Sequence, residues 1–277
     1  MNRLPRYPIY VPSKGRTDKK ALPCALLRRS GIPFSLVVEP QELEAYERVF
    51  GAECILTLPE NNKGLAYART WIKKHAQRAG HFMHWQFDDD IKQLRRWYKG
   101  KRVPAPAPAI LAACEDFVDR YENIGAAGIR HQAFADKTRP FLVNKFVYCV
   151  NLIRSDLPYQ WRTDRDDVDF SLQVLSGGWN TILFNSFFHE APTTGTNVGG
   201  CEASCYRKSD GKIKSIRQLQ RLWPALDIHV KRSAGYPQQS LGHIWRRFKT
   251  PLKRRPSVDL DTIKPNEYGM KLMMVTQ

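Results

Sequence analysis

The chain has 277 residues, is 42% hydrophobic and carries a formal net charge of +17. This length and apolar content indicate an ordinary globular protein of one large or two small domains, and they exclude a disordered chain. The excess of positive charge favours a polyanionic partner. No run approaches the roughly 18 apolar residues of a membrane helix, and residues 1–7 lack a secretory signal, so we expect a cytosolic protein.

The first ninety residues repeat one pattern of a short apolar run, a turn and a helical stretch. This alternation predicts an α/β fold with a mainly parallel sheet that is covered by helices on both faces. The loops that follow the strands then lie together at one edge of the sheet. The first loop contains neither a dinucleotide fingerprint nor a P-loop. We expect strands at residues 9–11, 34–38, 54–58 and 81–87, helices at 18–29, 40–51 and 65–79, and edge loops at 12–16, 39–42, 59–64 and 88–90.

The second half continues less regularly. After the acids at residues 88–90 we expect a helix-like basic segment at 91–97 and an extended linker at 99–108, where proline occupies alternate positions. The glycine-rich residues 193–200 are predicted to be mobile, as a lid would be. The remaining expected elements are a helix at about 109–121, strands at 126–129, 145–153 and 180–188, and a helix that opens in an acidic cluster and ends at residues 177–178.

The last part of the chain is basic and contains interleaved aromatic residues. Residues 207–255 hold fourteen Lys or Arg against two Asp. Because basic side chains neutralise phosphates and aromatic rings stack on unpaired bases, this composition favours nucleic acid, although a solvated basic face is the alternative. Six scattered cysteines are typical of reduced thiols, and the isolated pair Cys201 and Cys205 does not favour a zinc site. The aromatic residues are Tyr206, Trp223, Tyr236, Trp245 and Phe248.

Two acidic clusters and one histidine stand where the sheet edge is expected. Asp88, Asp89 and Asp90 follow the apolar run 81–87 directly. Three adjacent carboxylates repel one another, and a bound divalent cation is the usual offset, although a solvated acidic turn is the alternative. The second cluster, residues 164–169, contains four aspartates, whereas helix capping explains only one or two. His189 ends a later strand.

These residue types suit sugar transfer. Carboxylates bind Mg²⁺ or Mn²⁺, and Mn²⁺ also accepts an imidazole. A metal that bridges the two phosphates of a sugar nucleotide neutralises the leaving diphosphate. The second acidic cluster then supplies a base for the acceptor hydroxyl, which loses its proton as the new bond forms.

The ordered set of motifs resembles a glycosyltransferase of the GT-A fold, and within that fold the TET/JBP-associated glycosyltransferases of tailed bacteriophages. The resemblance covers roughly residues 7 to 200 and rests on Tyr10–Arg16, Asn61–Gly64 with Arg69, Phe87–Asp90, Asp166–Phe170 and His189. It implies a GT-A, Rossmann-like catalytic domain at residues 1–200 with a basic extension at 201–277 for DNA contact and packing. It also implies transfer from a UDP-sugar to 5-hydroxymethylcytosine in phage DNA, in the host cytoplasm.

The resemblance also implies roles for single residues. Asp88 and Asp90 match the outer acids of the GT-A Asp-x-Asp motif, so Asp90 would bind the metal and Asp88 the ribose or a metal-bound water. His189 would be a further metal ligand. Asp167 matches the base of inverting enzymes, with Asp166 and Asp169 as rivals. The implied nucleotide-binding residues are Pro12, Ser13, Arg16, Glu39, Asn62, Gly64, Arg69, Asp88 and Asp89.

Simpler interpretations stay open for several of these residues. Arg69 is alternatively a surface cation, His189 a satisfied histidine near the sheet, and Asp169 a helix cap or solvent-facing acid. Other functions also stay open: a glycosyltransferase with another acceptor, a nucleotidyltransferase or metal-dependent nuclease, and a nucleic-acid-binding module without chemistry. If the acceptor is duplex DNA, we expect the target base to be flipped out.

Overall fold

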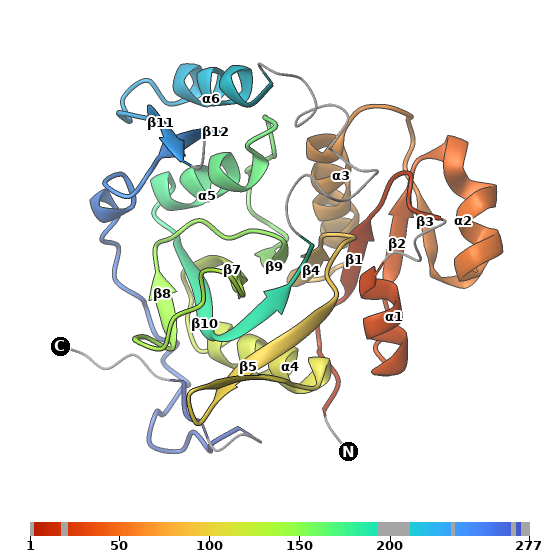
Figure 1. Cartoon of the computed structure of the whole chain (residues 1–277). Coiled ribbons are helices and arrows are strands. Elements are labelled where there is room, and N and C mark those ends of the chain that lie inside the picture. Colours follow the sequence, from red (N-terminus) through yellow and green to blue (C-terminus); the bar gives the residue numbers. More distant parts are fainter. Residues whose placement is uncertain (1–2, 18–21, 193–210, 234–235, 267–269, 273–277) are drawn as a thin grey trace.

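The computed structural model describes residues 3–17, 22–192, 211–233, 236–266 and 270–272. In these parts of the chain one ten-stranded sheet crosses the molecule, in the order β3-β2-β1-β4-β9-β7-β10-β5-β6, with β8 paired to β10 (Figure 1). The first four strands in this order run parallel to one another, as the alternating pattern predicted. They are β1 (Ile9–Pro12), β2 (Ser35–Val38), β3 (Ile55–Thr57) and β4 (Met83–Phe87).

The other half of the sheet is mixed. β9 (Val150–Arg154) runs antiparallel between β4 and β7 (Ile124–His131), and β10 (Asn180–Glu190) runs parallel to β7. β7 and β10 therefore point in the same direction as β4, and their carboxyl ends share its edge. The prediction of a mixed, mainly parallel sheet is confirmed. β8 spans Phe141–Val143.

Helices cover both faces, also as predicted. Alternate residues of β1 show which helices lie on each face. Ile9 and Val11 pack with α1, α2 and α4, whereas Tyr10 packs with α3 on the other face. α5 covers the same face as α3, further along the sheet, against β7 and β9 (Figure 1). The helices are α1 (Leu22–Arg29), α2 (Leu43–Phe50), α3 (Leu65–Arg78), α4 (Ala107–Val118), α5 (Asp166–Ser176) and α6 (Gly211–Leu222), with 3₁₀ turns at Pro40–Glu42, Ala52–Cys54 and Trp245–Arg247.

Two predictions for residues 91–108 are wrong. The expected helix-like segment is strand β5 (Gln93–Tyr98), and the expected linker contains strand β6 (Lys101–Pro104) and the start of α4. A two-residue turn joins the strands, and both its residues, Lys99 and Gly100, have positive φ angles of 45° and 76°, as a type I′ hairpin requires. β5 forms because it pairs with β10, far away in sequence.

The strand predicted at residues 145–153 is also shorter than expected. β9 starts only at Val150, and the preceding Cys149 has a φ of 62°. Such a backbone angle is unusual for a residue with a side chain, and it interrupts extended pairing. The turn that results brings the Cys149 carbonyl to within 2.7 Å of the Asp88 amide nitrogen, which donates a hydrogen bond to it.

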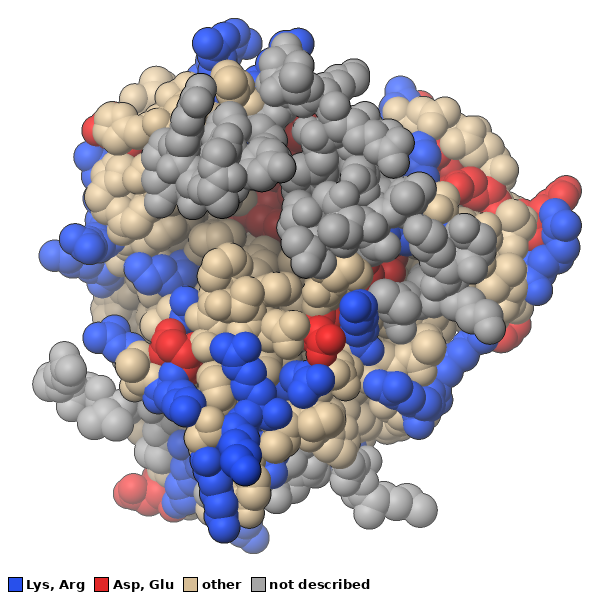
Figure 2. All heavy atoms as spheres, in the orientation of Figure 1, with Lys and Arg blue, Asp and Glu red and all other residues tan. Residues whose placement is uncertain are grey.

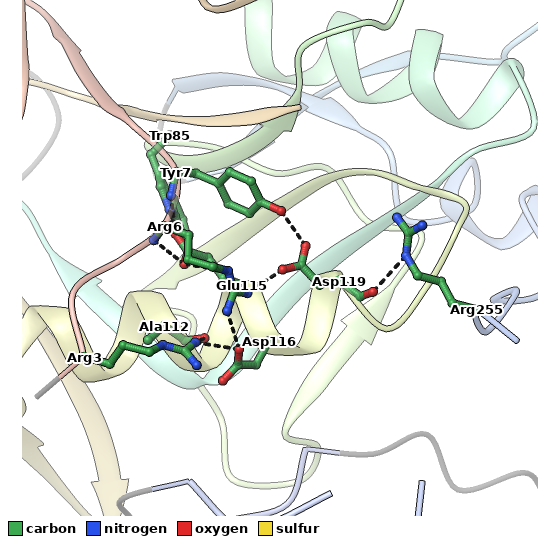
Figure 3. Close-up of polar contacts among 9 residues, drawn as sticks. All are labelled: Arg3, Arg6, Tyr7, Trp85, Ala112, Glu115, Asp116, Asp119 and Arg255. Atoms are coloured by element: carbon green, nitrogen blue, oxygen red, sulfur yellow. Dashed lines mark hydrogen bonds and ion pairs between the residues drawn. The ribbon is translucent and has the colours of Figure 1, made fainter. Parts of the chain in front are cut away.

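α4 anchors the start of the chain beneath β1 and β4 (Figure 3). The fully buried carboxylate of Glu115 accepts hydrogen bonds from the backbone amides of Arg6 and Tyr7 at 2.8 and 3.2 Å, and from Trp85 Nε1 at 2.9 Å. Near the end of the chain, Arg255 Nε donates to the Asp119 carbonyl at 2.9 Å. The bonds to Glu115 tie α4 to β4 and to the residues that precede β1, and the ends of these two strands carry the predicted site.

The described part of the predicted extension packs on α5. A second apolar cluster joins that helix to the extension, and it includes Val168 and Leu172 of α5 and Ile216 of α6. Ile228 and Leu241, which also belong to it, lie on either side of the hairpin of β11 (His229–Ser233) and β12 (Tyr236–Ser240). The extension therefore supports the helix that opens in the second acidic cluster. None of the described helices is long and apolar enough to cross a membrane.

Candidate active site

The two acidic clusters meet at one buried arginine. Arg69 projects from α3, and its side chain is 1% exposed. Its Nη2 donates to Asp88 Oδ1 at 2.7 Å, its Nε lies 2.8 Å from Asp166 Oδ2, and Nη2 lies 3.8 Å from Asp167 Oδ1. Arg69 is thus not a surface cation, because it joins the end of β4 to the start of α5.

The charges of this cluster shift one another. Burial alone lowers the pKa of the Arg69 guanidinium, but the carboxylates of Asp166, Asp88 and Asp167 raise it, and the net direction is upward. Burial raises the pKa of Asp88 to about 6, and it raises the pKa of Asp166 and of Asp167 as well, with Arg69 acting in the opposite direction each time. Perturbed carboxylates of this kind are typical of functional sites.

The three adjacent acids at the end of β4 point to three different environments. Asp88 joins Arg69, whereas Asp89 accepts a hydrogen bond from Ser13 Oγ at 2.7 Å and pairs with Arg16 Nε at 3.1 Å. Burial raises the pKa of Asp89 to about 7, although Arg16 and Ser13 both lower it. Asp90 is half-buried and has no hydrogen bond or ion pair to another described residue.

The loops after β1, β2 and β3 form one polar network next to Asp89. Ser13 Oγ and Tyr46 Oη are 2.8 Å apart, and Tyr46 Oη also accepts from the Arg16 amide at 3.1 Å. Lys14 Nζ bridges Glu39 at 2.8 Å and Asn62 at 2.7 Å. The remaining members of the predicted nucleotide set are Pro12, which ends β1, and Gly64, which precedes α3 with a φ of 83°.

His189 lies at the carboxyl end of β10, beside His131 of β7. Its Nδ1 bonds the Ile129 carbonyl at 2.8 Å, so Nδ1 carries the proton and Nε2 has a free lone pair. Nε2 is buried and has no partner among the described residues. Burial, together with the neighbouring His131, lowers the pKa of His189 to about 3, which keeps the ring neutral. His189 is therefore not a fully satisfied histidine.

Asp88, Asp90 and His189, the residues predicted to surround the metal, do not bring three ligand atoms within 4.8 Å of one another in this structure. Among the described residues, only Asp227, His229 and His243 place three such ligand atoms within 4.8 Å of one another, and they are exposed. That surface group is bonded within itself, because His229 Nε2 pairs with Asp227 Oδ2 and His243 Nε2 bonds the Asp227 carbonyl, each at 2.8 Å.

Asp169 does not belong to the acidic cluster around Arg69. Its side chain is fully buried and accepts from Arg162 at 2.6 and 3.0 Å, from Gln173 at 3.0 Å and from Trp223 Nε1 at 2.8 Å. These bonds tie α5 to the preceding loop and to the extension. Asp169 is neither a solvent-facing acid nor free to take a proton from an acceptor.

The structure also brings in residues that the sequence did not single out. Cys149 lies against Asp88, and burial, followed by the charge of Asp88, raises the pKa of its thiol. The rings of His131 and Tyr148 lie 5.2 and 6.0 Å from the ring of His189. No sequence signal marks these residues, because they reach the site through the pairing of β7, β9 and β10.

Comparison with known proteins now decides the family. The model of the TET-associated glycosyltransferases matches residues 7–200, most of the chain and all of the described cluster. The chain belongs to this family. It is therefore a glycosyltransferase, and the alternatives of a nuclease and of a binding module without chemistry are set aside. No curated protein matches the chain.

Two solved structures show a distant similarity to this chain. A putative nucleotide-diphospho-sugar transferase from Desulfovibrio desulfuricans is 11% identical, with a TM-score of 0.43, and the match covers 79% of this chain and 99% of that one. A mannose-1-phosphate geranyltransferase from Thermus thermophilus is 13% identical, with a TM-score of 0.33, over 91% and 69% of the two chains. TM-scores this low do not allow residues to be equated between the chains.

Proposed function

We propose that this glycosyltransferase moves a sugar from a UDP-sugar to the hydroxymethyl group of 5-hydroxymethylcytosine in DNA, with the help of a divalent metal. The observation that carries the proposal is the convergence of Asp88, Asp166 and Asp167 on the buried Arg69. This convergence lies at the edge where parallel strands end, which is where open α/β sheets bind ligands. The proposal includes the bacteriophage setting and the host cytoplasm.

The donor nucleotide is assigned to the network after β1, β2 and β3. Ser13 and Arg16, which hold Asp89, together with Pro12 and Glu39, form the side that receives the uridine. Asn62 and Gly64 precede α3, so the backbone amides at the start of that helix favour the negative charge of the diphosphate. Asp89 bonds this network, and the adjacent Asp88 bonds Arg69, so the two acids connect the network to the acidic cluster.

Mn²⁺ or Mg²⁺ is assigned to Asp90 and His189, with Asp88 contributing. Two observations fit a metal: His189 Nε2 is a buried lone pair without a described partner, and its Nδ1–H is held by a backbone carbonyl, as is usual for metal-binding histidines. The Asp90 carboxylate supplies oxygen ligands, and no described residue bonds or pairs with it. When bound, the ion neutralises the charge that develops on the leaving diphosphate.

Asp167 is assigned as the base that takes the proton of the acceptor hydroxyl. Its carboxylate is 3.8 Å from Arg69, further than those of Asp88 and Asp166, and Oδ1 accepts no hydrogen bond from a described residue. Because burial raises its pKa, it binds a proton more readily than an exposed aspartate does. Asp166 is held closer to Arg69 and is the rival. Direct attack by the hydroxyl then inverts the anomeric centre.

The test is an assay of transfer to DNA. The protein is incubated with a panel of UDP-sugars, Mn²⁺ and DNA that contains or lacks 5-hydroxymethylcytosine, and the nucleosides are analysed by mass spectrometry. We expect a hexose or N-acetylhexosamine mass gain on the modified DNA alone, abolished by Asp90→Ala. If no sugar is added although UDP raises the melting temperature in Mn²⁺, the acceptor is wrong. If UDP gives no such protection, the donor is wrong.

A further inference from the structure

We propose that the DNA acceptor is held by the β5–β6 hairpin and the adjoining turn, and not chiefly by the basic extension. This inference rests on the proposed function, because it identifies the surface that would bind that acceptor. We define the hairpin surface as Tyr98, Lys99, Lys101, Arg102, Phe134 and Lys137. Figure 2 shows basic side chains gathered on the molecular surface in the lower half of the view, where Figure 1 places β5.

The positive charge of this surface is not neutralised. Six Lys or Arg and no acid lie between Lys92 and Arg102. At the base of the hairpin, Arg95 pairs with Glu190 at 3.0 Å. In contrast, Lys99, Lys101, Arg102 and Lys137 are exposed, and no described carboxylate lies within 4 Å of them. Unpaired surface cations are what a phosphate backbone requires.

Aromatic rings alternate with these cations. Tyr98 is 50% exposed, with Arg96 and Lys99 4.8 and 5.6 Å from the centre of its ring. Arg102 and Lys137 lie 5.2 and 5.4 Å from the centre of the Trp97 ring. Phe134 is 63% exposed, the highest value among the large hydrophobic residues that the structure describes. Such alternation favours a strand whose phosphates meet the cations while its bases meet the rings.

The hairpin leads directly to the proposed metal site. β5 pairs with the end of β10, where Leu94 lies opposite His189. In the adjoining turn the Phe134 ring is 5.9 Å from the His131 ring, which is 5.2 Å from the His189 ring. A strand bound along the hairpin surface therefore reaches the site by way of Phe134. An exposed ring at this point is suited to contact a base that has left its stack.

The extension is less suited to stacking than its composition indicates. Trp245 is only 5% exposed and lies against the Phe146 ring at 5.7 Å, and Trp223 bonds Asp169. These two rings serve packing. Tyr206 and the side chain of Tyr236 lie outside the described parts of the chain. The exposed cations of the extension provide a matched control, because they carry charge without an exposed described aromatic ring between them.

The experiment compares two triple charge reversals. The hairpin variant is Lys99→Glu, Lys101→Glu and Arg102→Glu. The control variant reverses three exposed cations of the extension, Arg221→Glu, Arg246→Glu and Lys249→Glu. Affinity for fluorescein-labelled DNA containing 5-hydroxymethylcytosine is measured by anisotropy over a range of salt concentrations, without donor. Circular dichroism and protection by UDP against thermal unfolding establish that each variant is folded.

We expect the hairpin variant to lose at least tenfold in DNA affinity and the control variant to lose less than threefold. The slope of log affinity against log salt should fall by about 2 to 3 in the hairpin variant, because three phosphate contacts are lost. The KM for DNA should rise, while the KM for the UDP-sugar and the protection by UDP stay the same. Phe134→Ala should weaken binding by roughly tenfold, with the salt slope unchanged.

The other outcomes distinguish failure of the hairpin proposal from failure of the proposed DNA acceptor. If wild-type protein binds and glycosylates DNA, and the hairpin variant binds as wild type does or no worse than the control variant, the hairpin proposal is overturned and the proposed function stands. If wild-type protein binds no DNA although UDP protects it, the DNA acceptor fails, and the hairpin proposal fails with it.

Discussion

Replacing Arg69 by methionine should destabilise the protein by about 3 kcal/mol, because it leaves buried carboxylates without their cation. Removing one partner of a buried ion pair costs roughly 3 to 5 kcal/mol. The lower end applies here, since the side chains of Asp88, Asp166 and Asp167 are 27%, 13% and 25% exposed and water screens part of their repulsion. The assay is urea unfolding at pH 7.5, followed by fluorescence.

Two companion variants make this prediction sharp. Lys74→Met changes an exposed cation of the same helix and should alter the free energy of unfolding by less than about 0.5 kcal/mol. Adding Asp166→Asn to Arg69→Met should restore about 1 kcal/mol or more, because it removes one unpaired carboxylate. If Arg69→Met costs no more than Lys74→Met does, or if Asp166→Asn worsens it, the arginine does not neutralise this cluster.

Three further predictions concern other buried groups. Glu115→Ala should lower the free energy of unfolding by about 3 kcal/mol, measured in urea, because the buried Trp85 Nε1 and two partly buried backbone amides lose their acceptor; a loss below about 1 kcal/mol would contradict this. Asp169→Asn should lower stability with little effect on kcat, whereas Asp167→Asn should lower kcat by about 10² to 10⁴ with little effect on stability; the reverse pattern would exchange their roles. Burial lowers the pKa of His84 to about 3, so between pH 6.5 and 3 the unfolded chain binds a proton that the folded chain does not. The stability of wild type relative to His84→Gln should therefore fall by about 1.4 kcal/mol per pH unit in that window as the pH drops, and an unchanged difference between pH 7 and pH 5 would refute this.

The alternating elements of the first ninety residues were predictable because their signals are local. Each apolar run ends in a turn within a few residues, and the pattern of β1 to β4 follows from it. The hairpin of β5 and β6 was missed for the opposite reason. Of the residues in β5 only Leu94 is buried, so no apolar alternation marks the strand, and its pairing with β10 spans about ninety residues. The turn at Lys99 and Gly100 was the one available signal.

The site was predictable in its chemistry but not in its connections. The sequence placed acids at a strand end and at a helix start, and the structure brings the two together. The sequence did not predict that Arg69 would join the two groups of acids, because this side chain meets partners 19 and 97 residues away. Nor did it separate Asp167 from Asp169. The two lie on different sides of α5, and only the folded chain shows that Asp169 bonds Arg162 and Trp223.

Two of the three adjacent acids after β4 are paired with cations of the protein itself, which limits the acids that need a metal. Repulsion among Asp88, Asp89 and Asp90 indicated that a cation must offset their charge. The protein supplies two such cations itself, because Arg69 pairs with Asp88 and Arg16 pairs with Asp89. Asp90 alone has no described cation beside it. It follows β4, and His189, whose buried Nε2 has no described partner, lies at the same edge of the sheet. Asp90 is thus the acid whose charge the described part of the protein does not offset, so the proposed metal binding should depend on Asp90 far more than on Asp89.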